Sequence, residues 1–172
     1  MDMTPLIPPV DRELIERELT PERFLRDTNN AGNQIYVVTA ADSPNIMREI
    51  GRLREVAFRD AGGGTGEDVD IDELDLADNG YKQLIVWDPA GKEIIGGYRY
   101  IVSRSENTPN LSTEHYFRFS DRFRKEILPY TIELGRSFVQ PKYQGSRDNQ
   151  KGIYALDNLW DGLGALMVHN PD

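Results

Sequence analysis

Residues 82–102, KQLIVWDPAGKEIIGGYRYIV, predict two β-strands joined by a tight turn. The strands are expected over 82–87 and 93–102, where β-branched and aromatic residues dominate. Between them, residues 88–91 (Asp-Pro-Ala-Gly) fit a type I turn, because Pro is favoured at its second position and Gly at its fourth. Gly96 and Gly97, inside the second strand, predict a bulge or the close approach of another backbone.

A strong helix is expected on the N-terminal side of this hairpin, from Pro44 to about Phe58. Asp42 or Ser43 can cap it, and Pro44 suits the first helical position because its missing N–H would have no intrahelical partner. Apolar residues at helical spacing predict its buried face: Ile46, Ile50, Leu53 and Ala57. The glycine-rich stretch 61–66 ends the helix, and an acidic loop follows it.

The remaining segments show both strand and helix patterns. Strands are expected at 34–39 and 131–139, and helices at 12–19, from Pro21 onward, at 120–128 and at 152–168. This order predicts an α+β fold in which a mostly antiparallel central sheet is flanked by helices. We expect residues 1–33 to form an N-terminal helical extension and residues 34–172 to form the sheet-containing domain.

Composition excludes several classes of function. The 172 residues contain no cysteine, so disulfides, thiolate metal sites and a cysteine nucleophile are ruled out. Two histidines are too few for a histidine metal site, and a net charge of -9 argues against nucleic acid as a partner. The N-terminus does not resemble a signal peptide, and no apolar run approaches the roughly 20 residues of a membrane span. A cytoplasmic protein is expected.

Charged residues are segregated along the chain. Seven acids and no base lie between residues 67 and 78, whereas eight bases and four acids lie between 116 and 151. An acidic pocket suits an ammonium substrate, and a basic rim suits an anionic partner. The cations expected in that rim are Arg118, Arg122, Arg124, Lys125, Lys142 and Lys151.

A set of polar and aromatic side chains stands out as a candidate substrate site. Its members are Arg54, Phe58, Asp72, Asp75, Arg99, Glu133 and Arg136. Each has an ordinary structural explanation when taken alone, because helical arginines and acidic loops are usually solvated or ion-paired. Arg99 and Glu133 are harder to explain in this way, since they lie in otherwise apolar strands, where a buried charge needs a partner.

Taken together and in order, these motifs resemble the GNAT superfamily of N-acyltransferases over about residues 34–168. Arg-xxx-Phe, Asp-xx-Asp, a strand arginine and Glu-xx-Arg are similar to the acyl-homoserine-lactone synthases of the LuxI type. Asp-Glu-Leu-Asp at 72–75, Gly-Tyr-Arg at 97–99 and Glu-Leu-Gly-Arg at 133–136 look closer to the ornithine-lipid synthases. Related hemolysin-like bacterial proteins include amino-acid N-acyltransferases that make glycine lipids. Leu74 and Asn79 depart from the lipid-synthase pattern, which usually has Phe and His there.

The resemblance implies a GNAT-like sheet that lacks its C-terminal strands, so residues 34–172 would be the N-terminal part of an acyltransferase domain. It implies that a fatty acyl group moves from a thioester to the amino group of an amino-acid acceptor, glycine or ornithine. The donor would be acyl-CoA or acyl-phosphopantetheine on acyl carrier protein, with no tightly bound cofactor. Val139, Gln144, Gly145 and Lys151 are expected to hold it, because the N–H groups that begin the last helix suit a phosphate.

Glu133 is the candidate general base in such a reaction, because the amine must lose a proton. Asp72 and Asp75 would orient the amino group, while Arg99 and Arg136 would pair with these carboxylates or bind a substrate carboxylate. Arg54 and Phe58 are expected on the substrate side of their helix. Glu133 and Arg136 would point to opposite faces of an ideal strand, so both can serve one site only if a bulge, expected at Gly135, lies between them.

Two other interpretations stay open. An autoinducer synthase would use S-adenosylmethionine, but glycines occupy 62–64, where that family usually has a tryptophan beyond Phe58. A non-catalytic module or fragment is the second, because the chain ends soon after its last expected helix. An exposed sheet edge would then favour a homodimer. A lipid product would also favour peripheral contact with the inner membrane face, although the charge pattern of residues 12–19 fits an ordinary surface helix better.

Overall fold

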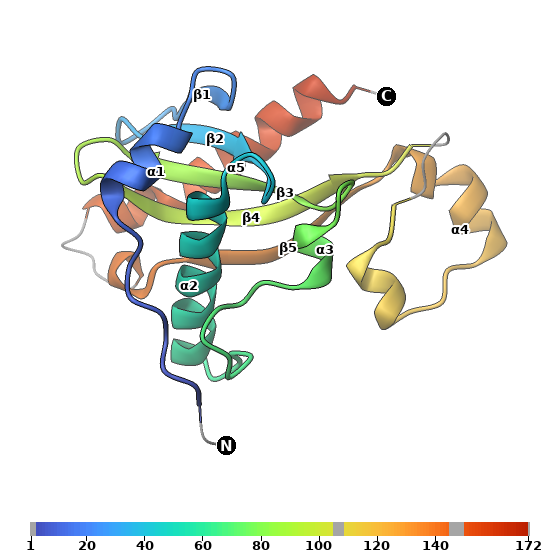
Figure 1. Ribbon diagram of the computed structural model, residues 1–172. Helices are drawn as coiled ribbons and strands as arrows, with labels where there is room; N and C mark the ends of the chain where they lie inside the picture. Colours follow the sequence, from blue (N-terminus) through green and yellow to red (C-terminus); the bar gives the residue numbers. More distant parts are fainter. Residues whose placement is uncertain (1–2, 105–108, 145–149, 172) are drawn as a thin grey trace.

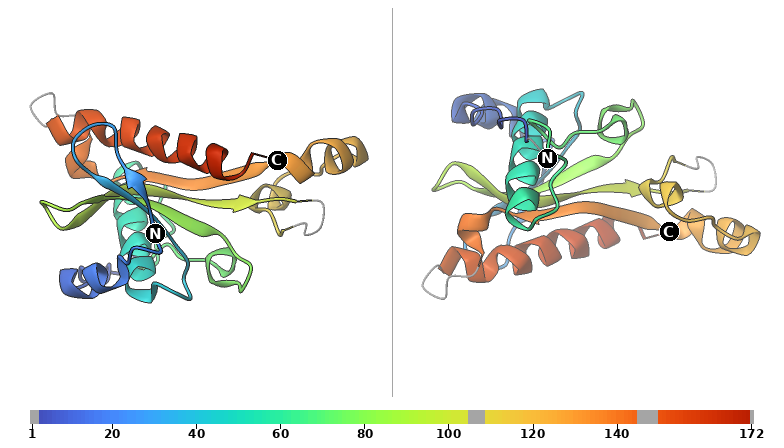
Figure 2. Two further views of the ribbon diagram at one scale, coloured as in Figure 1. Left: turned by 90° about the horizontal axis from the view of Figure 1, so that it is seen from above. Right: turned by 90° about the horizontal axis from the view of Figure 1, so that it is seen from below.

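The computed structural model describes residues 3–104, 109–144 and 150–171, with side chains from residue 153 onward in the last range. Its centre is a five-stranded sheet in the order β1-β2-β3-β4-β5, and every neighbouring pair is antiparallel. Helix α2 (Pro44–Asp60) covers one face of the sheet and α5 (Gln150–His169) covers the other (Figures 1 and 2). The predicted α+β fold with an antiparallel sheet flanked by helices is confirmed.

The predicted hairpin forms part of the middle of this sheet. Strands β3 (Lys82–Asp88) and β4 (Glu93–Val102) pair antiparallel, and the register shifts once along the pair. A Cβ added at Gly96 would lie 2.5 Å from the carbonyl oxygen of Phe138 in the next strand, and one at Gly97 would lie equally close to a carbonyl oxygen of β3. Of the two alternatives predicted for the glycine pair, the close approach is confirmed at both residues, and the register shift leaves Ile95, next to Gly96, as the extra residue.

Helix α2 begins and ends near its predicted bounds. Ser43 is the N-cap residue but makes no side-chain capping bond; the carboxylate of Glu18 accepts the N–H groups of Asn45 and Ile46 instead. The predicted apolar stripe is buried against the sheet: Ile46, Ile50, Leu53 and Ala57. The same helix also buries three charged side chains, those of Glu49, Arg54 and Glu55, and each of these must find a partner.

Helix α5 packs on the opposite face of the sheet, where a second core lies. Tyr98 and Tyr100 of β4 point to this side and contact the helix through Ala155, Leu159 and Leu166. Burial raises the pKa of Tyr100 to about 12, as expected for a hydroxyl among apolar neighbours. The two faces of the sheet therefore support separate apolar cores.

The N-terminal segment differs from the prediction. Helix α1 (Arg12–Glu18) forms as expected and is capped by Asp11, but the helix predicted from Pro21 onward is wrong. Residues 20–24 make a turn, and β1 (Phe24–Asp27) then pairs with β2 (Gln34–Val38). The physical reason is that β2 offers unpaired backbone groups along its edge, which outweigh the weak local preference for a helix.

Between β4 and β5 (Ile132–Val139) the chain leaves the sheet and forms a projecting arm, residues 111–131 (Figure 1). The arm holds η1 (Ser112–His115), α4 (Asp121–Glu126) and η2 (Leu128–Tyr130), and Ser120 caps α4 as predicted. Two short elements lie elsewhere: α3 (Glu73–Leu76) in the acidic loop and η3 (Pro141–Tyr143) after β5. None of the helices in the described ranges is long and apolar enough to cross a membrane.

Candidate functional site

Side chains from the acidic loop, β4 and β5 meet in one ion-pair network on the α2 side of the sheet. Nη1 of Arg99 donates to both carboxylate oxygens of Asp72, at 2.8 Å each. Arg136 donates to Asp72 at 3.2 Å and also to Asp70. The structure thus brings together three of the residues that the sequence singled out, across up to 64 positions of chain.

Asp72 is the centre of this network. Its side chain also caps α3, accepting the N–H groups of Leu74 and Asp75 at 3.0 and 3.1 Å. Burial alone would raise the pKa of Asp72, but the hydrogen bond and charge of Arg99 outweigh it and lower the pKa. Asp72 is therefore held as a carboxylate, with 24% of its side chain exposed.

Arg54 lies beneath this network and is fully buried. It donates to Asp75 at 3.0 Å and to Gln83 at 2.6 Å, and the amide of Gln83 in turn donates to Asp75 at 2.8 Å. The side chains of Arg54 and Asp75 are 0% and 1% exposed, so a direct substrate contact would require the pair to open. We expect them instead to hold the acidic loop against the sheet. Phe58, which follows Arg54 by four residues on α2, is partly buried against the apolar core between α2 and the sheet.

Strand β5 contains the expected bulge, but at a different residue. Between its pairings with Gly97 and Arg99, β5 has one residue more than β4. Arg136, with a φ of 51°, adopts the left-handed conformation that had been expected of Gly135. A Cβ at Gly135 would lie 3.4 Å from Nε of Arg99, an ordinary van der Waals contact, so the space around this residue does not require glycine. The bulge lets Glu133 and Arg136 serve the same face, and the ion pairs of Arg136 offset a strain of about 1–2 kcal/mol.

Glu133, the candidate general base, is held by three hydrogen bonds. The hydroxyl of Tyr81 donates to Oε1, while the hydroxyl and N–H of Thr113 donate to Oε2 at 2.6 and 3.3 Å. The guanidinium of Arg99 lies 4.5 Å from the centre of the Tyr81 ring and joins Glu133 to the network through that ring. Burial, followed by the bond to Glu133, raises the pKa of Tyr81, so its hydroxyl stays a donor.

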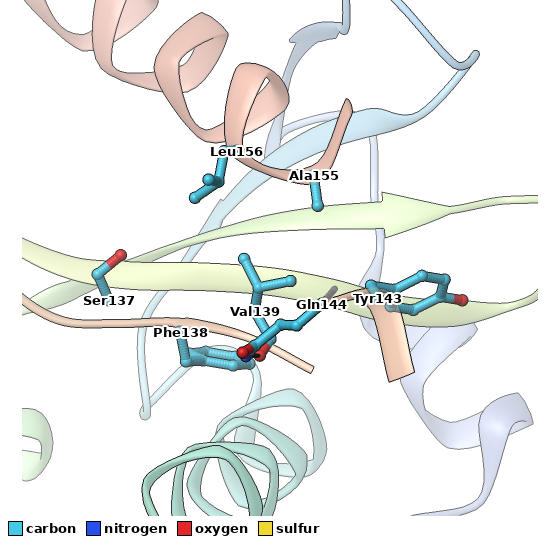
Figure 3. A pocket seen from close by; sticks show the side chains of 7 residues that line it. All are labelled: Ser137, Phe138, Val139, Tyr143, Gln144, Ala155 and Leu156. Atoms are coloured by element: carbon cyan, nitrogen blue, oxygen red, sulfur yellow. Dashed lines mark hydrogen bonds between the residues drawn. The ribbon is translucent and has the colours of Figure 1, made fainter. Parts of the chain in front are cut away.

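A pocket of about 400 Å³ lies on the other side of β5, beneath the first half of α5 (Figure 3). Figure 3 shows Ala155 and Leu156 above Ser137 and Val139, with Phe138 directed away from the helix. The full lining is Ser137, Phe138, Val139, Tyr143, Gln144, Ala155 and Leu156. A second hollow of about 260 Å³ shares Ser137 and Leu156 and continues toward Trp160. Together they form an apolar path along β5 and α5.

The pocket contains two of the four residues predicted to hold a donor, Val139 and Gln144. Gly145 and the side chain of Lys151 lie outside the described residues. The predicted basic rim does not form one patch. The arm precedes β5 and Lys142 follows it, so the arm cations lie at the opposite end of the strand from Lys142, which pairs with Glu93.

Four residues of the site were not identified from the sequence. Asp70 and Gln83 carry a detectable signal, since one belongs to the acidic run and the other is a polar residue within an apolar strand. Tyr81 and Thr113 carry none, because their common partner Glu133 lies 52 and 20 positions away. Only the fold makes them neighbours.

The chain is similar to an acetyltransferase domain family and to glycine N(alpha)-acyltransferases from two bacteria. The Acetyltransferase (GNAT) domain family matches residues 53–151. A glycine N(alpha)-acyltransferase from Phocaeicola vulgatus is 55% identical over 175 residues, an alignment that covers 99% of this chain and 54% of the relative. One from Bacteroides thetaiotaomicron is 57% identical over 175 residues, covering 99% of this chain and 52% of the relative. The chain thus spans about half the length of these relatives, and no solved structure matches it.

Proposed function

Because the chain belongs to the Acetyltransferase (GNAT) domain family, we propose that it forms part of an enzyme that transfers a fatty acyl group from a thioester to the amino group of an amino acid. Glycine is the proposed acceptor, since two relatives at 55% and 57% identity are named glycine N(alpha)-acyltransferase. Within the family we place the chain with the glycine-lipid and ornithine-lipid synthases, on the motifs at 72–75, 97–99 and 133–136.

The observation that carries this proposal is the apolar pocket between β5 and α5. At about 400 Å³ it has room for part of a thioester and its acyl chain, and Val139 and Gln144 lie where a donor was expected. The strand that forms its floor also carries Glu133 and Arg136, which point to the opposite face. A donor in the pocket and an acceptor near the polar network would therefore meet at β5.

In the proposed reaction the acceptor amine forms a C–N bond with the thioester carbonyl, and the C–S bond breaks. Glu133 takes a proton from the attacking amine, and that proton is passed on to the leaving thiolate, which becomes a thiol. Arg136 and Asp72, 30% and 24% exposed, are the network members that can reach an acceptor, through its carboxylate and ammonium respectively. The buried Arg54, Asp75 and Arg99 would keep these two groups in place.

The donor is proposed to arrive as acyl-CoA or on acyl carrier protein. Lys142 lies close to the pocket, in the helical turn that contains the lining residue Tyr143, and would exchange its partner Glu93 for the phosphate of either carrier. The same proposal includes association as a homodimer through the edge of β5, because β5 ends the described sheet. It also includes peripheral contact with the inner membrane face, because the product would be a lipid.

An acyl-transfer assay on the purified full-length protein tests this function. Glycine, ornithine and other amino acids would be offered with long-chain acyl-CoA and with acyl-carrier thioesters, and N-acyl products measured by mass spectrometry. Product from glycine is expected, and an absence of product from every combination would refute the proposal.

A donor-side variant makes the assay specific to the pocket. Leu156→Trp fills the space between β5 and α5, so KM for the donor should rise about tenfold while stability is unchanged. Ile153→Trp is the matched control, because Ile153 is 56% exposed on the same helix and does not line the pocket. Equal effects from the two substitutions would remove the pocket from the donor site.

A further inference from the structure

The projecting arm, residues 111–131, carries a group of exposed apolar side chains. Tyr116 is 80% exposed, Tyr130 72%, Phe117 65% and Ile127 51%. Single exposed apolar residues need no explanation, but several on one projecting segment indicate an interaction surface. We call these four residues the exposed arm side chains.

The charge of the arm differs from that of the rest of the chain. It contains four of the 20 cations and three of the 29 acids, whereas the whole chain carries a net charge of -9. Arg122 and Arg124 pair with acids of the arm itself. Arg118 and Lys125 are exposed and make no ion pair within the described part of the chain. These two cations therefore lie in the same segment of chain as the exposed aromatic residues.

Within the described residues the arm is anchored at its base. Leu111 and Leu128, each 2% exposed, pack with Tyr81 and Ile101, and Thr113 bonds to Glu133. Phe119 and Phe123 pack, partly buried, against the same apolar cluster. Beyond this base the arm extends past the end of the sheet and away from both covering helices (Figure 2). The arm can thus approach a flat surface before the sheet does.

We propose that the exposed arm side chains, with Arg118 and Lys125, bind an anionic phospholipid surface. Tyrosine and phenylalanine enter the headgroup region readily, and cations beside them are attracted to anionic lipids. The centre of a protein interface is by contrast depleted in lysine and requires a complementary shape. The proposal deepens the peripheral membrane contact proposed above, by assigning it to these residues, but its test does not depend on acyl transfer.

Co-sedimentation with vesicles tests it without any acyl donor. The protein should bind vesicles of phosphatidylcholine with phosphatidylglycerol more strongly than phosphatidylcholine alone, and added salt should weaken binding. Each cation near an anionic surface contributes about fivefold, so Arg118→Gln with Lys125→Gln should lower binding about 25-fold on anionic vesicles. Tyr116→Ser with Phe117→Ser should lower it about tenfold or more on both kinds of vesicle.

Ile153→Ser is the matched control, because Ile153 is 56% exposed on α5, outside the arm and outside both hollows along β5. It should bind vesicles like the unmodified protein, and circular dichroism should show that all variants keep the fold. The proposal is overturned if no vesicle is bound, or if Ile153→Ser loses as much binding as the arm variants. It is also overturned if Arg118 and Lys125 prove to bind an acidic carrier protein while vesicles are ignored.

Discussion

The two faces of the central sheet are built by opposite means. On the α2 face charged side chains are buried and paired, with Arg54 and Arg99 only 0% and 2% exposed. On the α5 face apolar side chains surround about 400 Å³ of open space, and Leu156 at the pocket remains 63% exposed. Strand β5 contributes to both faces: at its bulge Arg136 points to the α2 face and Ser137 to the α5 face.

The contrast indicates that the α2 face is rigid and that the α5 face is suited to binding. A buried ion pair is costly to break, so the α2 face holds its polar groups in one arrangement. An open apolar surface has no such constraint and can accept a flexible chain. In the proposed enzyme, the first face would orient the amine and the second would hold the donor.

The largest expected effect is on the buried pair of the α2 face. Arg54→Ala leaves Asp75 buried without its cation, so the free energy of unfolding should fall by about 3–5 kcal/mol. Urea denaturation followed by circular dichroism measures it. Arg17→Ala is the control, since Arg17 is 72% exposed in its pair with Glu13 and should cost at most about 1 kcal/mol. Similar losses in both variants would show that burial does not govern the α2 face.

Glu133 has two roles that variants can separate: it is the proposed general base, and its bond to Thr113 anchors the arm. As general base it should make Glu133→Gln about 100-fold slower in turnover, with little change in the unfolding temperature. Thr113→Val removes a bond that holds the carboxylate but keeps the carboxylate itself, so turnover should fall much less. If the two variants lose turnover equally, Glu133 acts mainly as the anchor of the arm.

Glu55 makes the stability of the α2 face depend on pH. Burial alone would raise the pKa of Glu55, but bonds from Arg59, Thr65 and Gly66 outweigh it and lower the pKa to about 2 from an ordinary 4.5. Because the folded pKa is the lower one, this stabilisation is complete above pH 4.5 and is lost as the pH falls toward 2.

The free energy of unfolding should therefore be about 1–3 kcal/mol lower in Glu55→Gln than in the unmodified protein at neutral pH. Denaturation series at several pH values should show this difference shrinking between pH 4.5 and 2. A difference that stays constant with pH would mean that the charge of Glu55 does not hold the glycine-rich turn.

The smallest expected effect concerns the bulge in β5 that joins the two faces. Arg136→Gly and Arg136→Ala both lose the ion pairs, but only glycine is relaxed at a φ of 51°. The glycine variant should therefore be more stable than the alanine variant by about 1 kcal/mol in urea denaturation. An alanine variant of equal or greater stability would show that the left-handed conformation is not retained.

Several elements could be predicted because their signals are local. The hairpin at 82–102 and the helix from Pro44 are recognised from turn residues and apolar periodicity alone. Strand β1 was mistaken for a helix, since its stability comes from pairing with β2 and not from its own residues. In the same way Asp72, Arg99 and Arg136 could be singled out as unusual charges, while Tyr81 and Thr113 could not.

The sequence by itself determined the α+β fold, the main helix, the hairpin and which charged residues need an explanation. These features follow from periodicity, turn chemistry and the cost of burying charge, all of which act over a few neighbouring residues. Only the tertiary structure decided that Arg136 and not Gly135 carries the bulge, that Arg54 is closed off, and that Glu133 is bonded to the arm. Each depends on the register between distant strands, which no local pattern specifies.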